Sequence, residues 1–282
     1  MRRVVTTINE IAMSLLSLSK FRLSSLVALS ALFGQLFYNL QLQNLTFLGV
    51  LFLAFACAFI NQLQDRDLDP LMRRTSVREQ HIERIGVPGV VVAAATLILL
   101  GLYLCNSLEA KILGTLSLLL YNLLYTPLKR RTHLAIIPGA LCGLTPPWIG
   151  WVSAGGELFA YEILYVILLF FLWQFPHTWI TLLKNRDDYL KTPLATLLNL
   201  LGTDALRRIF ITWMLLIAIL VLGAPWFLHF HFLTPKILSV LAALLFLGAT
   251  IRRERGFMLT NLALVVFMLA ALAEKMMLQK FP

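Results

Sequence analysis

The sequence predicts an all-α polytopic membrane protein, a single domain over residues 1–282 with nine transmembrane helices and a cytoplasmic N-terminus. Hydrophobic residues make up 59% of the chain and charged residues 13%, whereas about a quarter of a soluble domain is charged. The mean hydropathy is +0.81. Apolar runs near the ~20 residues that a bilayer requires alternate with short polar segments.

The first element, residues 1–20, is expected to be an amphipathic helix at the membrane surface, because Val4, Ile8, Ile11 and Leu15 recur at helical spacing. The nine expected spans follow in chain order. They cover about 23–40, 47–63, 87–106, 108–126, 134–152, 159–184, 209–227, 236–251 and 257–277.

The basic residues predict the orientation of these spans. With the N-terminus inside, Arg252, Arg253 and all but four of the other Lys and Arg residues fall on the cytoplasmic side. An error of one span would scramble this division. The same rule accounts for the net charge of +10, so we expect a multi-pass protein of the cell inner (plasma) membrane that contacts lipid and binds no nucleic acid. A mitochondrial inner-membrane location is the weaker alternative.

The densest acidic cluster follows the second span. Asn61, Asp65 and Asp69 lie four residues apart and therefore share one helix face, whereas Asp67 points elsewhere. Carboxylates at the mouth of a membrane helix repel one another and resist desolvation, so they need a cation. A solvated acidic loop is the alternative interpretation.

A basic strip that includes Arg74 and Arg78 follows directly. Acid to hold a divalent ion, with arginines for anionic oxygens, is what a diphosphate–metal complex requires. An EF-hand loop is excluded, because Pro70 and Ser76 stand where its Gly and Glu are needed. Positive-inside arginines would explain the charge but not its position beside three aspartates.

Another cluster closes the fourth span. Lys129 and Arg130 can clamp phosphate oxygens, and Tyr125 precedes Lys129 by one helical turn. Topological charge alone would also account for these basic residues.

A polar stripe marks the sixth span. Gln174, His177, Thr181, Lys184 and Asp188 recur at spacings of three and four, so they share a face that we expect to point into the bundle. His177 is then expected to face a ligand.

Together these motifs resemble the UbiA superfamily of intramembrane prenyltransferases, and within it most closely the protoheme IX farnesyltransferases (haem O synthases). The resemblance covers roughly residues 15–205. It rests on Asn61-x-x-x-Asp65-x-x-x-Asp69, on Met72-x-Arg74-Thr75-x-x-Arg78, on Tyr125-Thr-Pro-Leu-Lys-Arg-Arg-Thr132, on Pro146-Pro147-x-Ile149-Gly150-Trp151 and on Pro176-His177 before Asp188-Tyr189.

The resemblance implies a helical bundle around a central cavity with two facing aspartate sites. Mg²⁺ would be held there by Asp65, Asp69, Asp187 and Asp188 and would bridge to farnesyl diphosphate. The prenyl group would pass to a vinyl group of haem B, with His177 near the porphyrin. Haem A synthase and oxidase-assembly proteins are candidate partners.

The chain departs from the family pattern in three places. Phe21 stands between Lys20 and Arg22 where Pro is usual, Glu79 follows Arg78 without the usual Pro-Leu-Pro, and the segment after Asp188 is shortened. A different acceptor, such as an aromatic quinone precursor, therefore stays open. A transporter or a non-catalytic binding protein is a further alternative, although the charged motifs gather at one membrane face rather than at the midplane.

Overall fold

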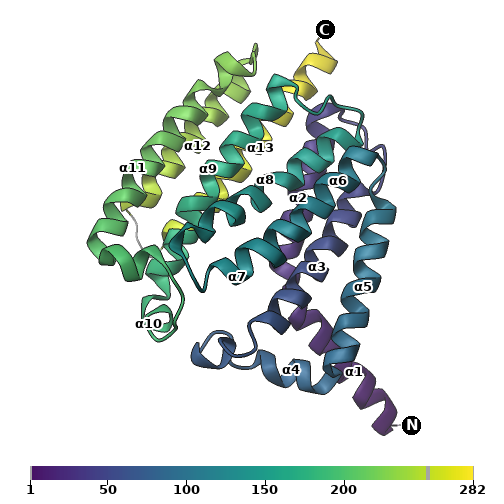
Figure 1. Cartoon of the computed structure of the whole chain (residues 1–282). Coiled ribbons are helices and arrows are strands. Elements are labelled where there is room, and N and C mark those ends of the chain that lie inside the picture. The colour runs from purple at the N-terminus through teal and green to yellow at the C-terminus, as the bar shows by residue number, and fades with distance from the viewer. Residues whose placement is uncertain (1, 252–254, 282) are drawn as a thin grey trace.

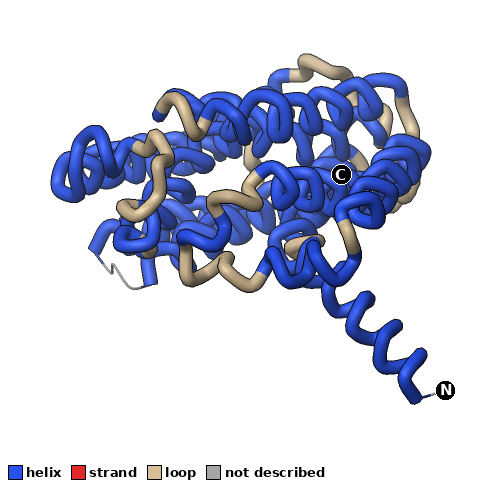
Figure 2. The backbone as a smooth tube through the Cα atoms, turned by 60° about the horizontal axis from the view of Figure 1, so that its bottom comes forward, coloured by secondary structure: helices blue, strands red, loops and turns tan. Residues whose placement is uncertain are grey.

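The computed structural model describes residues 2–251 and 255–281, and within these ranges every regular element is helical (Figure 2). Arg252 and Arg253 lie outside the described residues, and so do the side chains of Val4 and Ile8.

The long helices are α1 (Arg2–Leu18), α2 (Phe21–Tyr38), α3 (Thr46–Gln64), α5 (Val87–Leu104), α6 (Leu108–Leu118), α8 (Ile136–Ser153), α9 (Tyr161–Lys184), α11 (Leu197–Phe227), α12 (Leu233–Ile251) and α13 (Gly256–Lys280). The short elements are η1 (Asp69–Leu71), α4 (Arg78–Ile85), η2 (Leu119–Tyr125), α7 (Thr126–Leu128), η3 (His133–Ala135) and α10 (Arg186–Tyr189).

Eight helices in the described part of the chain are long and apolar enough to cross a membrane: α2, α3, α5, α8 with η3, α9, α11, α12 and α13. The all-helical, multi-span architecture is therefore confirmed. The count of nine is not, because the expected span 108–126 is divided between α6 and η2. The segment η2 is a π-helix, whose wider turns interrupt the α-helical register.

The helices form two groups in Figure 1. One contains α2, α3, α5, α6 and α8, and the other contains α9, α11, α12 and α13, with α8 packed against α9 between them. Large apolar side chains on the outer faces, such as Leu99, Tyr103 and Ile219, are 71%, 81% and 67% exposed. Apolar surface of this kind suits contact with lipid.

Helices α2 and α8 approach each other so closely that their backbones touch. A Cβ atom at Gly34 would overlap the carbonyl of Pro147, and one at Gly150 would overlap the carbonyl of Ala31. Small residues allow this approach, as is usual between membrane helices. Because a carbonyl belongs to the backbone, it cannot move aside as a flexible side chain would.

The Arg- and Asp-rich segments around α4 and α10 lie at the same end of the bundle as α1 (Figure 1). Helix α1 packs on α4 and projects beyond the other helices (Figure 2). Leu18 and Ser14 are buried in this contact region, whereas Met13 and Leu16 are exposed. An N-terminal helix is thus present, and its amphipathic character and its position at the membrane surface stay predictions.

The α2–α8 contact predicts that Gly150→Ala destabilises the fold by about 2 kcal/mol, because the added methyl group must push two helix backbones apart. Thermal unfolding in detergent measures the loss. Gly248→Ala in α12 is the matched control, since its added Cβ would meet only Leu259 Cδ1 at 3.9 Å. Equal unfolding temperatures for the two variants would contradict the prediction.

Candidate active site

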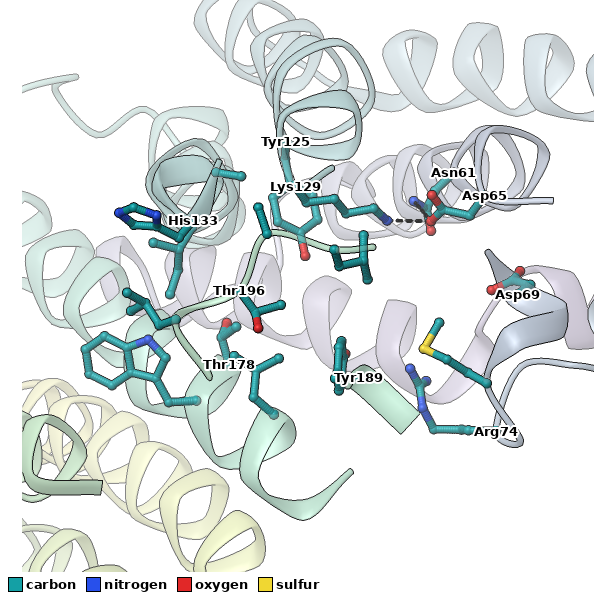
Figure 3. Close-up of a pocket in the computed structure, with 18 of the residues that line it drawn as sticks. Asn61, Asp65, Asp69, Arg74, Tyr125, Lys129, His133, Thr178, Tyr189 and Thr196 are labelled. Atoms are coloured by element: carbon teal, nitrogen blue, oxygen red, sulfur yellow. Dashed lines mark hydrogen bonds and ion pairs between the residues drawn. The ribbon is translucent and has the colours of Figure 1, made fainter. Parts of the chain in front are cut away.

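A cavity of about 240 Å³ lies at the polar end of the bundle (Figure 3). Its lining comes from Lys20 with the start of α2, the end of α3, the segment from Asp69 to Arg78, η2 with the turn after α7, η3 with the start of α8, the end of α9, and residues 189–197. Segments far apart in the sequence thus meet around one space.

Asp65 is the centre of a hydrogen-bonded cluster on one wall. Its Oδ2 accepts bonds from Asn61 Nδ2 at 2.9 Å and from Lys129 Nζ. Asn61 Nδ2 also lies 3.2 Å from Thr126 Oγ1. Figure 3 shows Lys129 reaching across the cavity to Asp65. Asn61 and Asp65 are both buried, so the predicted i, i+4 pair shares a face.

Asp69 is 2% exposed and lies beyond the end of α3. Its Oδ1 accepts a hydrogen bond from Arg78 Nη1 at 2.9 Å, and Thr75 Oγ1 donates to its backbone carbonyl at 2.9 Å. Its Oδ2 is buried with no hydrogen-bond partner. Burial raises the pKa of this carboxyl group, against the lowering effect of Arg78.

Lys20 lines the cavity, although no sequence motif predicted it as a site residue. It lies between α1 and α2 with φ 50°, which is rare for a side chain of this size. Its Nζ donates to Asn61 Oδ1 at 2.7 Å. Burial, with repulsion from Arg78 and Lys129, lowers the pKa of Lys20 to about 7. One sequence signal could have identified Lys20 as a site residue. It directly precedes the first span and lies on the same predicted side of the membrane, the cytoplasmic side, as the acidic motif.

The π-helix η2 positions the aromatic wall. Tyr121 and Tyr125 both line the cavity, with ring centroids 5.5 Å apart, and Lys129 Nζ lies 5.7 Å from the Tyr125 ring centroid. Asn122, on the same π-helix, donates to the Cys57 carbonyl of α3 at 3.1 Å. The π-helix η2 is therefore hydrogen-bonded to α3, the helix that Asp65 follows.

The lining carries more positive than negative charge. Its acidic residues are Asp65 and Asp69, and its Lys and Arg residues are Lys20, Arg74, Arg78 and Lys129. A pocket with this excess of positive charge favours an anion, and guanidinium and ammonium groups are the usual partners of phosphate oxygens.

The acidic residues also fit a magnesium ion. Asp69 Oδ2 has no protein partner, and Asp65 and the Asn61 amide supply further oxygen atoms. Within the described ranges no group of three or more His, Cys, Asp or Glu side chains could hold a metal. Mg²⁺ is commonly bound by one or two carboxylates, with substrate phosphates and water as its remaining ligands. Two aspartates would therefore be enough on the protein side.

Helix α9 turns a different face to the cavity from the one expected. Thr178, Trp179 and Leu182 line it, whereas His177 and Lys184 do not. The His177 ring lies 4.4 Å from Trp173 and 4.9 Å from Phe257 of α13. Successive residues of a helix point about 100° apart, so the face of α9 that carries Thr178 differs from the face that carries His177.

The other expected site residues lie outside the cavity lining. Asp187 is exposed, and its Oδ1 lies 3.5 Å from Arg186 Nη1. Asp188 is half-buried. Tyr189, next in the chain, is the residue of α10 that reaches the cavity. Arg130 also does not line it and pairs with Asp67 instead.

Comparison with known proteins places the chain in a family. Residues 23–257 match the UbiA prenyltransferase family. A protoheme IX farnesyltransferase of Nitratidesulfovibrio vulgaris is 33% identical over 260 residues, covering 88% of each chain. One of Bdellovibrio bacteriovorus is 32% identical over 241 residues, covering 82% of each chain.

Solved structures show the same fold. A UbiA homolog from Archaeoglobus fulgidus bound to GPP and Mg²⁺ superposes with a TM-score of 0.72 at 15% identity, covering 93% of this chain and 99% of that one. A digeranylgeranylglyceryl phosphate synthase structure gives a TM-score of 0.73 at 18% identity, covering 94% of this chain and 98% of that one. The chain therefore belongs to the UbiA prenyltransferase family.

Proposed function

We propose that the protein transfers a farnesyl group from farnesyl diphosphate to a vinyl group of haem B, giving haem O, in a Mg²⁺-dependent reaction. The observation that carries the proposal is the cavity that pairs two buried carboxylates with four basic side chains. Relatives named protoheme IX farnesyltransferase over most of the chain support the choice of acceptor.

In this proposal Lys20, Arg78 and Lys129 donate hydrogen bonds to the diphosphate. As the allylic C–O bond breaks, its electron pair leaves with the diphosphate, and these cations stabilise the added charge. Bound Mg²⁺ would be held by Asp65 and Asp69 and would supply Lewis-acid neutralisation of the same oxygens.

The new carbon–carbon bond, between the farnesyl group and the vinyl group of haem B, forms on the side of the cavity lined by the tyrosines. The ring faces of Tyr121 and Tyr125 can stabilise an allylic cation. A vinyl carbon of haem B attacks that cation, and water adds to the resulting centre. The proton that water loses balances the charge gained by diphosphate.

We further propose that α6, η2 and α7 together cross the membrane once, as the fourth crossing in chain order, which brings the total to nine. The N-terminus and the cavity then lie on the cytoplasmic side of the plasma membrane. The basic residues of the connecting segments support this orientation. Haem A synthase or oxidase-assembly proteins are the proposed recipients of the product.

The activity is tested with purified protein in nanodiscs given haem B, farnesyl diphosphate and Mg²⁺. We expect mass spectrometry to show a haem that carries a hydroxyethylfarnesyl group, and we expect EDTA to abolish its formation until Mg²⁺ is restored. Prenylation of an aromatic quinone precursor with no change in haem would overturn the proposed acceptor.

Asp69→Asn is expected to lower kcat/KM by about 100-fold or more, because it removes the charge on the carboxylate whose Oδ2 is left for the metal. Initial rates of haem O formation measure the effect. Asp204→Asn serves as the control, since Asp204 is exposed on α11 away from the cavity lining. Full activity of Asp69→Asn would exclude Asp69 as a metal ligand.

Lys20→Gln is expected to raise the KM for farnesyl diphosphate by about tenfold, with a smaller effect on kcat, if Lys20 binds the diphosphate in the ground state as well as in the transition state. Steady-state kinetics at saturating haem B and Mg²⁺ separate the two constants. The exposed Lys191 supplies a matched substitution, Lys191→Gln. An unchanged KM in Lys20→Gln would remove Lys20 from the diphosphate site.

A further inference from the structure

The segment 64–69, which we call the acidic turn, sets the distance between the two cavity carboxylates. Asp65 is the C-cap residue directly after α3, and Asp69 begins η1. Within the turn, the backbone N–H groups of Leu68 and Asp69 both donate to the Asp65 carbonyl at 2.9 Å. Any change in the shape of this turn therefore moves one carboxylate relative to the other.

Arg130 holds the acidic turn from outside the cavity. Its Nη1 and Nη2 donate to Asp67 Oδ2 and Oδ1 at 2.6 and 2.7 Å, so the pair is bidentate. Nη2 also donates to the backbone carbonyl of Gln64, at 2.5 Å, and lies 3.4 Å from Asp65 Oδ1. One guanidinium group thus contacts three successive parts of the turn.

The two neighbouring basic residues have separate positions. Lys129 lines the cavity and its Nζ contacts Asp65. Arg130 is outside the lining, and both of its terminal nitrogens, Nη1 and Nη2, donate hydrogen bonds to the turn.

We propose that Arg130 and Asp67 are a positioning pair that fixes the acidic turn, and that Arg130 does not bind the diphosphate itself. The pair acts through Asp65 and Asp69, so the inference rests on the proposed metal–diphosphate function of that cavity. Only arginine supplies a planar fork that can bind a carboxylate with two parallel hydrogen bonds and reach a carbonyl as well.

The test compares Asp67→Asn and Arg130→Lys with the unaltered protein in nanodiscs. Mn²⁺ serves as the probe metal, and its binding is followed by electron paramagnetic resonance without any turnover. We expect both variants to weaken Mn²⁺ binding and to raise the KM for farnesyl diphosphate by about fivefold, as the loss of one well-formed ion pair implies. At saturating Mg²⁺ and donor, kcat should change less than KM.

The matched control is Glu79→Gln. It removes the other bidentate pair on the turn, in which Arg66 Nε lies 3.0 Å from both Glu79 oxygens, but leaves the link to Arg130 intact. We expect metal affinity and KM to stay unchanged.

Three results would overturn the inference. The first is loss of donor affinity in Arg130→Lys with none in Asp67→Asn, since Arg130 would then contact the diphosphate. The second is an equal loss in Glu79→Gln. The third is lowered melting temperature in both variants with unchanged Mn²⁺ affinity, which would make the pair a general stability element. Because Mn²⁺ binding requires no acceptor, failure to form haem O would contradict the proposed reaction and not the positioning pair.

Discussion

The structure depends on the cost of burying Asp65 and Asp69 at the end of a membrane helix. A buried carboxylate without a partner is strongly destabilising, and each of these two receives a basic side chain from another segment of the chain. Lys129 comes from the turn after α7, and Arg78 comes from the start of α4. The same need for positive charge both ties these segments to α3 and leaves a cavity suited to an anion.

Much of this arrangement could be predicted from local pattern. Hydropathy located the apolar part of the long helices, as in the expected 47–63 against the observed Thr46–Gln64, because a bilayer imposes length and apolarity. It missed the start of α11, which begins at Leu197 and not at 209. Helical spacing also placed Asn61 and Asp65 on one face. That prediction needed only the period of the helix, and no knowledge of its neighbours.

What could not be predicted depended on contacts between helices. The period of α9 identified a polar stripe but not its direction, and packing turned Thr178 and Trp179 to the cavity while His177 met Phe257. The π-helix η2 could not be distinguished from an ordinary span by hydropathy. Lys20 reached Asn61 only because the chain bends there through an uncommon backbone conformation.

The backbone contact between α2 and α8 bears on how such a protein can change its substrates. Both helices contribute to the cavity wall, through Leu23 and Ile136, and their crossing accepts no side chain at Gly34 or Gly150. The crossing therefore fixes the distance between the two helices. A change in the shape of the cavity on this side has to come from exchange of lining side chains such as Leu23 and Ile136, because the helices cannot shift without losing their backbone contact.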